Sequence, residues 1–515
     1  MQRKLRHLRG LVVVLTLSSC ALPKHVARTP SHALPGTERT TLGALIAPAV
    51  AAHPSQSGFL LYNDGEGAIQ ARVALTEVAQ SSIDAQYFLW AGDAIGRVLI
   101  DRIVAAADRG VRVRLLIDDY ASAGHDTAFD TLAAHPNIDV RVFNPYARGW
   151  MRILQLLGRF NELNRRMHNK LFVVDGQVAV VGGRNLSDDY FGLGTKLSFR
   201  DFDLLALGPV VAQAEGGFDQ YWNSQWAYPI HALLKPSSPA KQAEARRRFE
   251  AKLAADLARF PYALPHGRDE ALAWMERSRG QAIWAPAEIV YDDPKSMANP
   301  AKSPPGLVWN AMVALARQAE HEIVAENAYL VPQEKKAPGY RELCARGVTV
   351  RLLTNSLAST DVVPVNAHYA TTRPELVDMG MELYEMKPWA ASRERYIAHA
   401  SRSKAHLALH GKAAVFDRKT VFVGSFNLDP RSAALDTETV FVIHSPELAE
   451  QLLDAFATDF EPANAWRIGK VAGKHKVAWI TEQPAQPVVE PHDPAGAWRR
   501  FVRSIEKALP IRSLL

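Results

Sequence analysis

Apolar runs typical of buried strands alternate with amphipathic stretches typical of helices, and the same order occurs twice along the chain. The first half predicts a strand at 83–89, a helix at 94–110, strands at 111–119 and 138–144, and a hairpin at 171–183. The second half predicts the corresponding elements at 323–330, 339–347, 348–355, 381–386 and 413–425. Continuous apolar strands between helices are typical of sheets covered on both faces. We therefore predict an α/β fold of two tandem repeats, each a mixed β-sheet flanked by helices.

The regions outside the repeats differ from them in composition. A charged helical stretch at 238–260 predicts an inserted helical element between the repeats, and a basic, Pro-rich tail ends in a last helix. The predicted organisation is a signal peptide at 1–19, a tether and N-terminal segment at 20–57, a first repeat at 58–230, a helical linker at 231–300, a second repeat at 301–465 and a C-terminal tail at 466–515.

The N-terminus has the pattern of a secretory signal. A basic stretch precedes the short apolar run LVVVLTL, which is far below the roughly 20 residues needed to span a bilayer. The following Leu17-Ser18-Ser19-Cys20 resembles a bacterial lipobox, so Cys20 is the expected lipid anchor; a conventional signal peptide is the alternative. Ala21 after the cysteine favours a lipoprotein of the bacterial cell envelope at the outer membrane, facing the periplasm. Cys344 then has no partner for a disulfide.

Charge gives little reason to expect a nucleic-acid partner. The formal net charge is +6, but four basic residues and no acidic ones lie in the predicted signal, so 6 − 4 = +2 remains. That balance lacks the strongly basic character of nucleic-acid-binding proteins. Because the chain contains neither CxxC nor HExxH spacing, no metal site is expected.

One short motif occurs in both repeats. His168-x-Lys170 is followed by Asp175, and His410-x-Lys412 is followed by Asp417. Each motif opens a predicted hairpin that ends in small residues and an asparagine, Asn185 or Asn427. The spacing is identical, since 410 − 168 = 242 and 427 − 185 = 242. A histidine beside a strand is usually a packing residue, but two copies in register indicate one symmetric cationic site suited to a phosphodiester.

The two segments, MHNKLFVVDGQVAVVGGRNLSDDYFG and LHGKAAVFDRKTVFVGSFNLDPRSAALDTE, resemble the two signature segments of the phospholipase D superfamily. Their flanks resemble its cardiolipin synthase C-like branch. The resemblance extends from about Gly58 to the C-terminus, and it implies one active site shared at the interface between the repeats. It implies no cofactor, because the histidines carry the chemistry.

The resemblance also assigns roles to these residues. It implies that His168 is the nucleophile and His410 the general acid and base, although the symmetry of the sequence leaves that order open. Lys170, Lys412, Asn185 and Asn427 would bind the phosphate oxygens. Asp175 and Asp417 complete the motifs at the hairpin turns, where the family gives them a structural role more than a chemical one.

A catalytic histidine needs a carboxylate on its second ring nitrogen to fix its tautomer. Glu438 on the strand after the second hairpin, and Asp203 at the comparable place in the first repeat, are the predicted orienting residues. Asp201 and Asp436 are the second choice.

The substrate is predicted less directly. An amphipathic helix at 148–166 has an apolar face flanked by arginines, so it could rest on an anionic lipid surface or pack into the core. We predict a membrane-bound transphosphatidylase that makes cardiolipin from phosphatidylglycerol and a phospholipid donor through a phosphohistidine. The alternatives are hydrolysis to phosphatidic acid, a phosphodiesterase acting on nucleic acid, and a lipoprotein that binds lipid without turnover. The sequence leaves the oligomeric state open.

Overall fold

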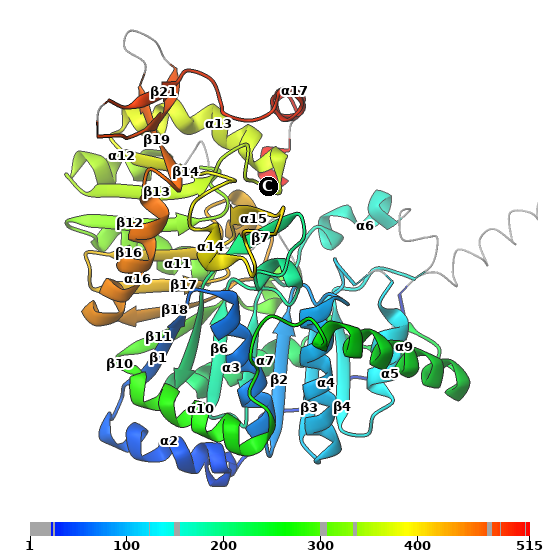
Figure 1. Ribbon diagram of the computed structural model, residues 1–515. Coiled ribbons are helices and arrows are strands. Elements are labelled where there is room, and N and C mark those ends of the chain that lie inside the picture. Colours follow the sequence, from blue (N-terminus) through cyan, green and yellow to red (C-terminus); the bar gives the residue numbers. More distant parts are fainter. Residues whose placement is uncertain are drawn as a thin grey trace, which may run out of the picture.

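Figure 1 shows the computed structural model, in which two sheets with their helices lie one above the other. The structure describes residues 22–23, 26–122, 124–148, 155–298, 306–332, 337–470, 476–484, 486–509 and 511–514. The predicted signal peptide and Cys20 lie outside these residues. Within them, no helix is both long enough and apolar enough to cross a membrane.

The first sheet has nine strands, and it is mixed because β2, β3 and β4 run parallel while the other neighbours are antiparallel. Its spatial order is β10 (Ile283–Ala285), β1 (Ser57–Tyr62), β8 (Asp203–Leu207), β6 (Val178–Gly182), β5 (Leu171–Val174), β2 (Ser82–Tyr87), β3 (Arg112–Asp118), β4 (Ile138–Phe143) and β9 (Ala227–Pro229).

The second sheet has ten strands and the same mixture of pairings around β12, β13 and β14. Its spatial order is β11 (Ala287–Tyr291), β18 (Thr439–His444), β17 (Thr420–Gly424), β16 (Lys412–Phe416), β12 (Glu322–Asn327), β13 (Thr349–Asn355), β14 (Glu382–Met386), β19 (Ala465–Lys470), β20 (Val477–Thr481) and β21 (Val488–Glu490). The order β8-β6-β5-β2-β3-β4 thus corresponds to β18-β17-β16-β12-β13-β14. The predicted α/β fold of two tandem repeats is confirmed.

Helices cover the sheets on both sides. In the first half of the chain they are α2 (Thr41–Ala52), α3 (Gly65–Val78), α4 (Ala94–Asp108), α5 (Asp126–Ala133), α6 (Gln155–Leu163), α7 (Pro209–Trp222), α8 (Ile230–Leu233), α9 (Pro239–Leu257) and α10 (Gly267–Gln281). In the second half they are α11 (Leu307–Gln318), α12 (Ala337–Ala345), α13 (Val363–Asp378), α14 (Arg393–Tyr396), α15 (Pro430–Ala434), α16 (Pro446–Phe460) and α17 (Ala497–Glu506). Short 3-10 turns occur at Thr37–Arg39, Asp188–Tyr190, Pro294–Ala298 and Arg512–Leu514.

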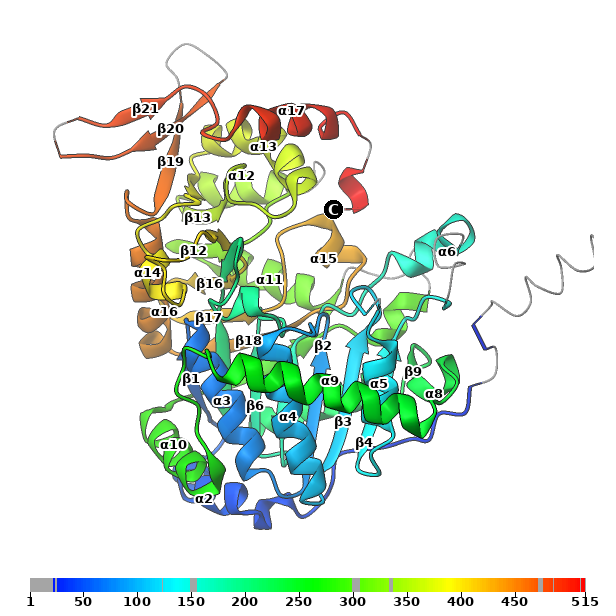
Figure 2. The same ribbon diagram turned by 45° about the vertical axis from the view of Figure 1, so that its right-hand side comes forward.

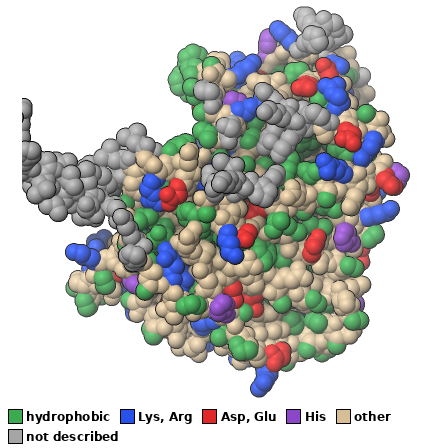
Figure 3. All heavy atoms as spheres, turned by 180° about the vertical axis from the view of Figure 1, so that it is seen from behind, with side chains coloured by type: hydrophobic (Ala, Val, Ile, Leu, Met, Phe, Trp, Pro, Cys, Tyr) green, Lys and Arg blue, Asp and Glu red, His purple; other side chains and the backbone are tan. Residues whose placement is uncertain are grey.

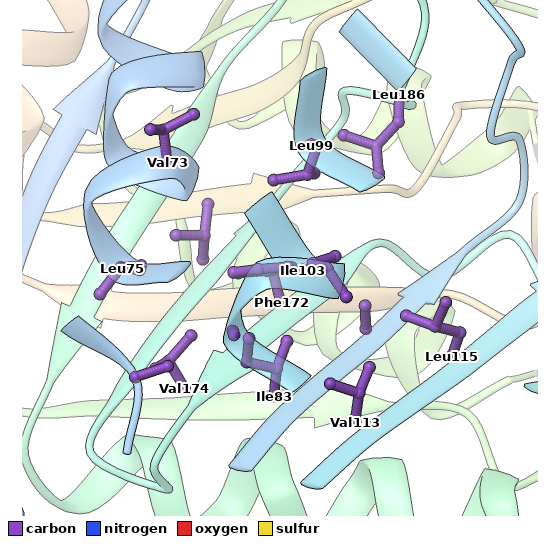
Figure 4. Packing of buried hydrophobic residues seen from close by; sticks show 14 of the residues in the cluster. Val73, Leu75, Ile83, Leu99, Ile103, Val113, Leu115, Phe172, Val174 and Leu186 are labelled. Carbon is purple, nitrogen blue, oxygen red and sulfur yellow. The ribbon is translucent and has the colours of Figure 1, made fainter. Parts of the chain in front are cut away.

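Aliphatic side chains of α3, α4 and the first sheet form the hydrophobic core between these helices and the sheet. Figure 4 shows Leu99 and Ile103 of α4 above Ile83 of β2 and Val113 of β3, all fully buried. Continuous apolar character in these strands is needed because the other face of the sheet is buried as well.

A second core joins the two repeats. It combines side chains of β5, β6, β8 and α7 with side chains of β16, β17, β18 and α16. Phe59 contacts Phe441, and Phe202 contacts Phe456, with ring centroids 5.6 and 5.5 Å apart. Because this apolar interface is continuous, the two motif hairpins are held in a fixed relation to each other.

The chain between the repeats contributes more than the predicted helices. Figure 2 shows α9 lying across the first repeat, where it packs against α4 and α5. After α10, β10 and β11 follow each other and become edge strands of the first and second sheets. At the other end of the chain, β19 pairs with β14 and extends the second sheet into the predicted tail.

Candidate active site

The two motif histidines are placed by the same device in both repeats. The backbone N–H of His168 donates to the carbonyl of Thr437 at 2.9 Å, and the N–H of His410 donates to the carbonyl of Arg200 at 2.8 Å. Thr437 precedes Glu438, and Arg200 precedes Asp201. Each histidine is therefore bonded across the interface to the residue just before a carboxylate of the other repeat.

Around His410 this pairing extends to a short parallel sheet. β7 (Leu197–Arg200) of the first repeat pairs with β15 (His406–Leu409) of the second, in the register Leu409 to Arg200. Around His168 the corresponding contact is a single parallel bridge between Met167 and Thr437. At both histidines, a segment of one repeat therefore pairs with a segment of the other.

Contacts between the histidines and two carboxylates also cross from one repeat to the other. Glu438 lies 2.9 Å from Nδ1 of His168, and Asp201 lies 2.6 Å from Nδ1 of His410. Each histidine thus contacts a carboxylate from the opposite repeat. Because Nδ1 is engaged in both rings, Nε2 is the nitrogen left for chemistry at the phosphorus.

The prediction that Asp203 orients a histidine is wrong. Asp203 is buried against Arg72, whose guanidinium nitrogen lies 2.9 Å from its carboxylate, and against Arg184 at 3.5 Å. The sheet register explains the error, since Gly182 pairs with Asp203 where Gly424 pairs with Val440. Asp203 therefore corresponds to Val440, and Asp201 corresponds to Glu438.

Two of the other three predicted carboxylates contact a histidine. Asp201 and Glu438 contact the histidines, while Asp436 pairs with Arg431 at 3.1 Å and accepts a hydrogen bond from the backbone of Arg166. The second-choice pair is thus half right in geometry, because one of its two members reaches a histidine.

The two orienting carboxylates differ in charge state. Burial raises the pKa of Glu438 to about 7, although Lys170 and the hydroxyls of Ser425 and Ser432 oppose that rise. Burial acts on Asp201 in the same direction, but His410, Lys412 and Arg184 together outweigh it and bring the pKa of Asp201 to about 2. The site therefore has one firmly ionised carboxylate and one that titrates near neutral pH.

Both motif lysines are fully buried in the same site. Lys170 donates to the carbonyl of His168 at 2.5 Å, and Lys412 donates to the carbonyl of His410. Burial lowers the pKa of Lys170 to about 7 and that of Lys412 to about 8, against the attraction of the nearby carboxylates. Lys412 also lowers the pKa of Lys170, so the two motifs share one electrostatic environment.

Burial and the lysines act on the histidines in the same direction. Burial is the largest cause that lowers the pKa of His410, to about 4, and it lowers the pKa of His168 well below its ordinary value. Both rings are therefore neutral at pH 7 in the free protein. A neutral imidazole is the form that can act as a nucleophile.

The predicted asparagines lie at the same site. Asn185 donates to the hydroxyl of Tyr190 at 2.9 Å, and the ring of Tyr190 contacts the ring of His410, with centroids 4.8 Å apart. The side-chain oxygens of Asn185 and Asn427 are buried without a hydrogen-bond partner among the described residues. Because an amide can rotate to present its NH2 group, both residues are suited to a phosphate oxygen.

Comparison with known proteins agrees with this geometry. The family model described as "Cardiolipin synthase, PLD-like domain" matches residues 74–222 and again residues 312–460. Cardiolipin synthase C of Escherichia coli is 34% identical over 92% of this chain and 99% of its own length. The chain belongs to this phospholipase D-like family. The predicted class of enzyme, a phosphatidyltransferase, is confirmed.

Two further matches are less similar to this chain in sequence. Cardiolipin synthase B of Salmonella typhimurium is 27% identical over 73% of this chain and 74% of its own length. A crystal structure of phosphatidylserine synthase from Haemophilus influenzae matches with a TM-score of 0.56 at 13% identity, covering 89% of this chain and 95% of the other. At that identity the match supports the fold of this family member alone.

Several residues at the site were missed by the sequence reasoning. Ser425 and Ser432 hold Glu438, while Phe88 contacts the ring of His168 with centroids 5.2 Å apart. Ser425 stands in the small-residue turn of the second motif, so its position carried a signal. Ser432 lies in the same signature segment, six residues before Glu438, whereas Phe88 lies in another segment and is brought to the site by the tertiary fold.

The motif aspartates do not contact the histidines. Asp175 is buried at the turn between β5 and β6 with φ 52°, and its carboxylate accepts from the backbone N–H groups of Gln80, Ser81 and Ser82. Asp417 has φ 50° and accepts from residues 320–322 in the same way. Each aspartate thus fastens a hairpin to the helix-to-strand turn beside it, which is a structural role.

Replacing Asp175 by alanine is expected to lower the free energy of unfolding by roughly 2–4 kcal/mol, since three N–H groups lose a charged acceptor. Urea unfolding followed by circular dichroism measures the change. Asp417→Ala is the matched control, and it should cost less because Asp417 is only partly buried. Loss of turnover in a fully folded Asp175→Ala protein would contradict the structural role.

The predicted amphipathic helix at 148–166 is described only in part. Residues 149–154 lie outside the described residues, and the helix α6 begins at Gln155. Phe160 on α6 is 43% exposed. Leu163 at the end of the same helix is buried, so the described part of the helix has apolar side chains both in solvent and in the core.

Proposed function

We propose that this protein transfers a phosphatidyl group from a phospholipid donor to the terminal hydroxyl of phosphatidylglycerol, which forms cardiolipin. The observation that carries the proposal is the exchanged pair of His–carboxylate contacts beside two buried lysines. A symmetric site of this kind can bind one phosphodiester and exchange one alcohol for another on it.

In the first step Nε2 of His168 attacks the phosphorus. A P–N bond forms, the P–O bond to the donor's head group breaks, and His410 gives its proton to the departing oxygen. The negative charge of the bound phosphodiester raises the proton affinity of His410 above that in the free protein. The product of this step is a phosphatidyl group held on His168.

The second step reverses the first with a new alcohol. His410, now neutral, takes the proton of the phosphatidylglycerol hydroxyl, whose oxygen attacks the phosphorus and breaks the P–N bond. Lys170 and Lys412 donate to the non-bridging oxygens throughout, together with Asn185 and Asn427. Two displacements in line give net retention of configuration at phosphorus.

The substrates of this reaction are membrane lipids, so we also propose attachment to the bacterial cell envelope through Cys20. The cysteine and its signal segment lie outside the described residues, and the lipobox sequence supports this part of the proposal. An outer-membrane position facing the periplasm follows from Ala21.

The reaction is tested by incubating the purified protein in mixed micelles with phosphatidylglycerol, with and without phosphatidylethanolamine, and identifying products by mass spectrometry. Cardiolipin that appears with the intact protein and not with His168→Ala is the expected result. The released head group, glycerol or ethanolamine, identifies the donor. Phosphatidic acid as the only product would replace the transferase by a hydrolase, and no lipid turnover would refute both.

The buried lysines predict how activity depends on pH. Each is a cation only below its own pKa, so stabilisation of the phosphate is lost as pH rises through about 7 for Lys170 and about 8 for Lys412. The value of kcat/KM should therefore fall on the alkaline side. In Lys170→Arg the fall should shift to higher pH, because a guanidinium keeps its proton. The exposed Lys419→Met is the control, and an alkaline limb that Lys170→Arg leaves unmoved would refute this cause.

A further inference from the structure

The helix α17 (Ala497–Glu506) turns large apolar side chains toward solvent. Trp498 is 72% exposed, Phe501 54% and Ile505 52%. Their spacing of three and four residues places them on one face of the helix, and Leu509 just beyond it is exposed as well. The rings of Trp498 and Phe501 contact each other. A continuous row of this kind marks an interaction surface, whereas single exposed apolar residues do not.

The basic side chains of α17 fix this orientation. Arg499 donates to the carbonyl of Thr360, while Arg503 pairs with the buried carboxylate of Asp493. Arg500 donates to the backbone carbonyl of Asp493 at 3.1 Å. Figure 2 shows the helix lying along α13, and Arg373 of α13 pairs with the same Asp493 at 3.7 Å. Seen from behind, hydrophobic side chains project at the upper left edge, where the turn by 180° places α17 (Figure 3).

A chain of contacts links the helix to the active site on the side of the second repeat. Asp361, next to the Thr360 that Arg499 binds, accepts a hydrogen bond from the hydroxyl of Tyr329 at 2.9 Å. The ring of Tyr329 lies 5.9 Å from the ammonium of Lys412. Three contacts therefore connect the exposed helix to a phosphate-binding lysine.

The first repeat contributes one exposed and one half-buried aromatic residue near the same site. Tyr120 is 57% exposed and stacks on Phe88, which in turn contacts His168. Arg431 links the two sides, since it donates to the carbonyl of Asn164 at 2.6 Å and to the carbonyl of Leu514 at 2.9 Å. The aromatic residues and α17 therefore border one site from opposite repeats.

Charge identifies the occupant of this surface. Residues 497–514 contain five basic residues and one acidic residue, so 5 − 1 = +4. Arg500 and Lys507 among them are exposed, and a helix that combines an apolar outer face with exposed cations fits the boundary of an anionic bilayer. A second copy of α17 would bring like charges together. Two other occupants, a second copy and a protein, are outcomes of the tests below.

We propose that α17 is an interfacial anchor that inserts Trp498, Phe501 and Ile505 into an anionic phospholipid surface. The anchor holds the mouth of the active site against the lipid, so that acyl chains need not leave the bilayer fully when the phosphate reaches the histidines. This benefit to turnover rests on the proposed function, whereas insertion of the helix does not.

Insertion is tested with the full chain in vesicles of phosphatidylglycerol and phosphatidylethanolamine whose acyl chains carry bromine, which quenches tryptophan fluorescence on contact. The difference between the intact protein and Trp498→Phe isolates the signal of Trp498. That signal should be quenched. Trp389, which is 62% exposed outside α17, is the matched control, and its signal should stay unquenched. An unquenched Trp498, or equal quenching of both, would overturn the proposal.

The effect on turnover is tested with the double variant Phe501→Ser and Ile505→Ser. We expect its rate on vesicles to fall about tenfold and its rate in mixed micelles to stay within about twofold, because detergent delivers the lipid without docking. The control is Leu257→Ser, an exposed apolar residue at the end of α9. An equal loss in micelles, or an oligomer that the double variant dissociates, would overturn the proposal. An intact protein without turnover in either system would refute the proposed function, while the bromine experiment would still test the anchor.

Discussion

The variant His410→Asn is expected to stop with a phosphatidyl group attached to His168 when the donor is a phosphatidyl ester of p-nitrophenol. This leaving group departs as a stable anion and needs no proton from His410, so the first step survives. The second step needs His410 as a base for the acceptor alcohol, and removing a positioned base costs about 10²–10⁴-fold. We expect a burst of about one p-nitrophenolate per enzyme, followed by that loss in steady turnover.

The opposite variant distinguishes the two histidines. His168→Asn should give no burst, and mass spectrometry of the His410→Asn protein should find the phosphatidyl group on the peptide that contains His168. A burst in His168→Asn, with the group on His410, would reverse the assigned order. This order is open from geometry, because both rings have Nδ1 held by a carboxylate and Nε2 available.

The fold and the central site residues could be predicted because they depend on local patterns. Apolar strands, amphipathic helices and two motifs in register with a spacing of 242 residues define the repeats and nominate the His, Lys and Asn pairs. The edge strands β10 and β11 could not be predicted, since three and five residues beside a charged helical segment carry little periodicity.

The spacing of the two motifs is not enough to predict both carboxylates that orient the histidines. In the first repeat Asp201 follows Gly183 by 18 positions, as 201 − 183 = 18, whereas in the second Glu438 follows Ser425 by 13 positions, as 438 − 425 = 13. Because of that difference of five positions, the step that leads from Ser425 to Glu438 leads from Gly183 to Lys196, so the motif spacing does not distinguish Asp201 from Asp203. Exchange between repeats was also hidden, because sequence order gives no sign that each carboxylate serves the other repeat's histidine.

The variant Asp201→Asn is expected to lower steady turnover of natural lipids by about 10³–10⁴-fold, although the asparagine occupies nearly the same volume. The neutral amide no longer stabilises the imidazolium of His410 and can favour the wrong tautomer, which is the reason that a buried carboxylate behind a catalytic histidine matters. Because Asp201 acts through His410, the p-nitrophenyl donor should restore the first step. The burst should persist while steady turnover remains low.

Asp203→Asn is the matched control, because Asp203 is equally buried and begins β8 two residues after Asp201. It weakens the pair with Arg72 and should reduce the free energy of unfolding, by up to roughly 3–5 kcal/mol for an uncompensated buried charge, while the folded fraction retains normal turnover. If this variant does not fold, the double replacement Arg72→Met and Asp203→Leu removes both partners and serves instead. Equal losses of turnover in folded Asp201→Asn and Asp203→Asn would contradict the assignment, because only Asp201 reaches a histidine of the opposite repeat.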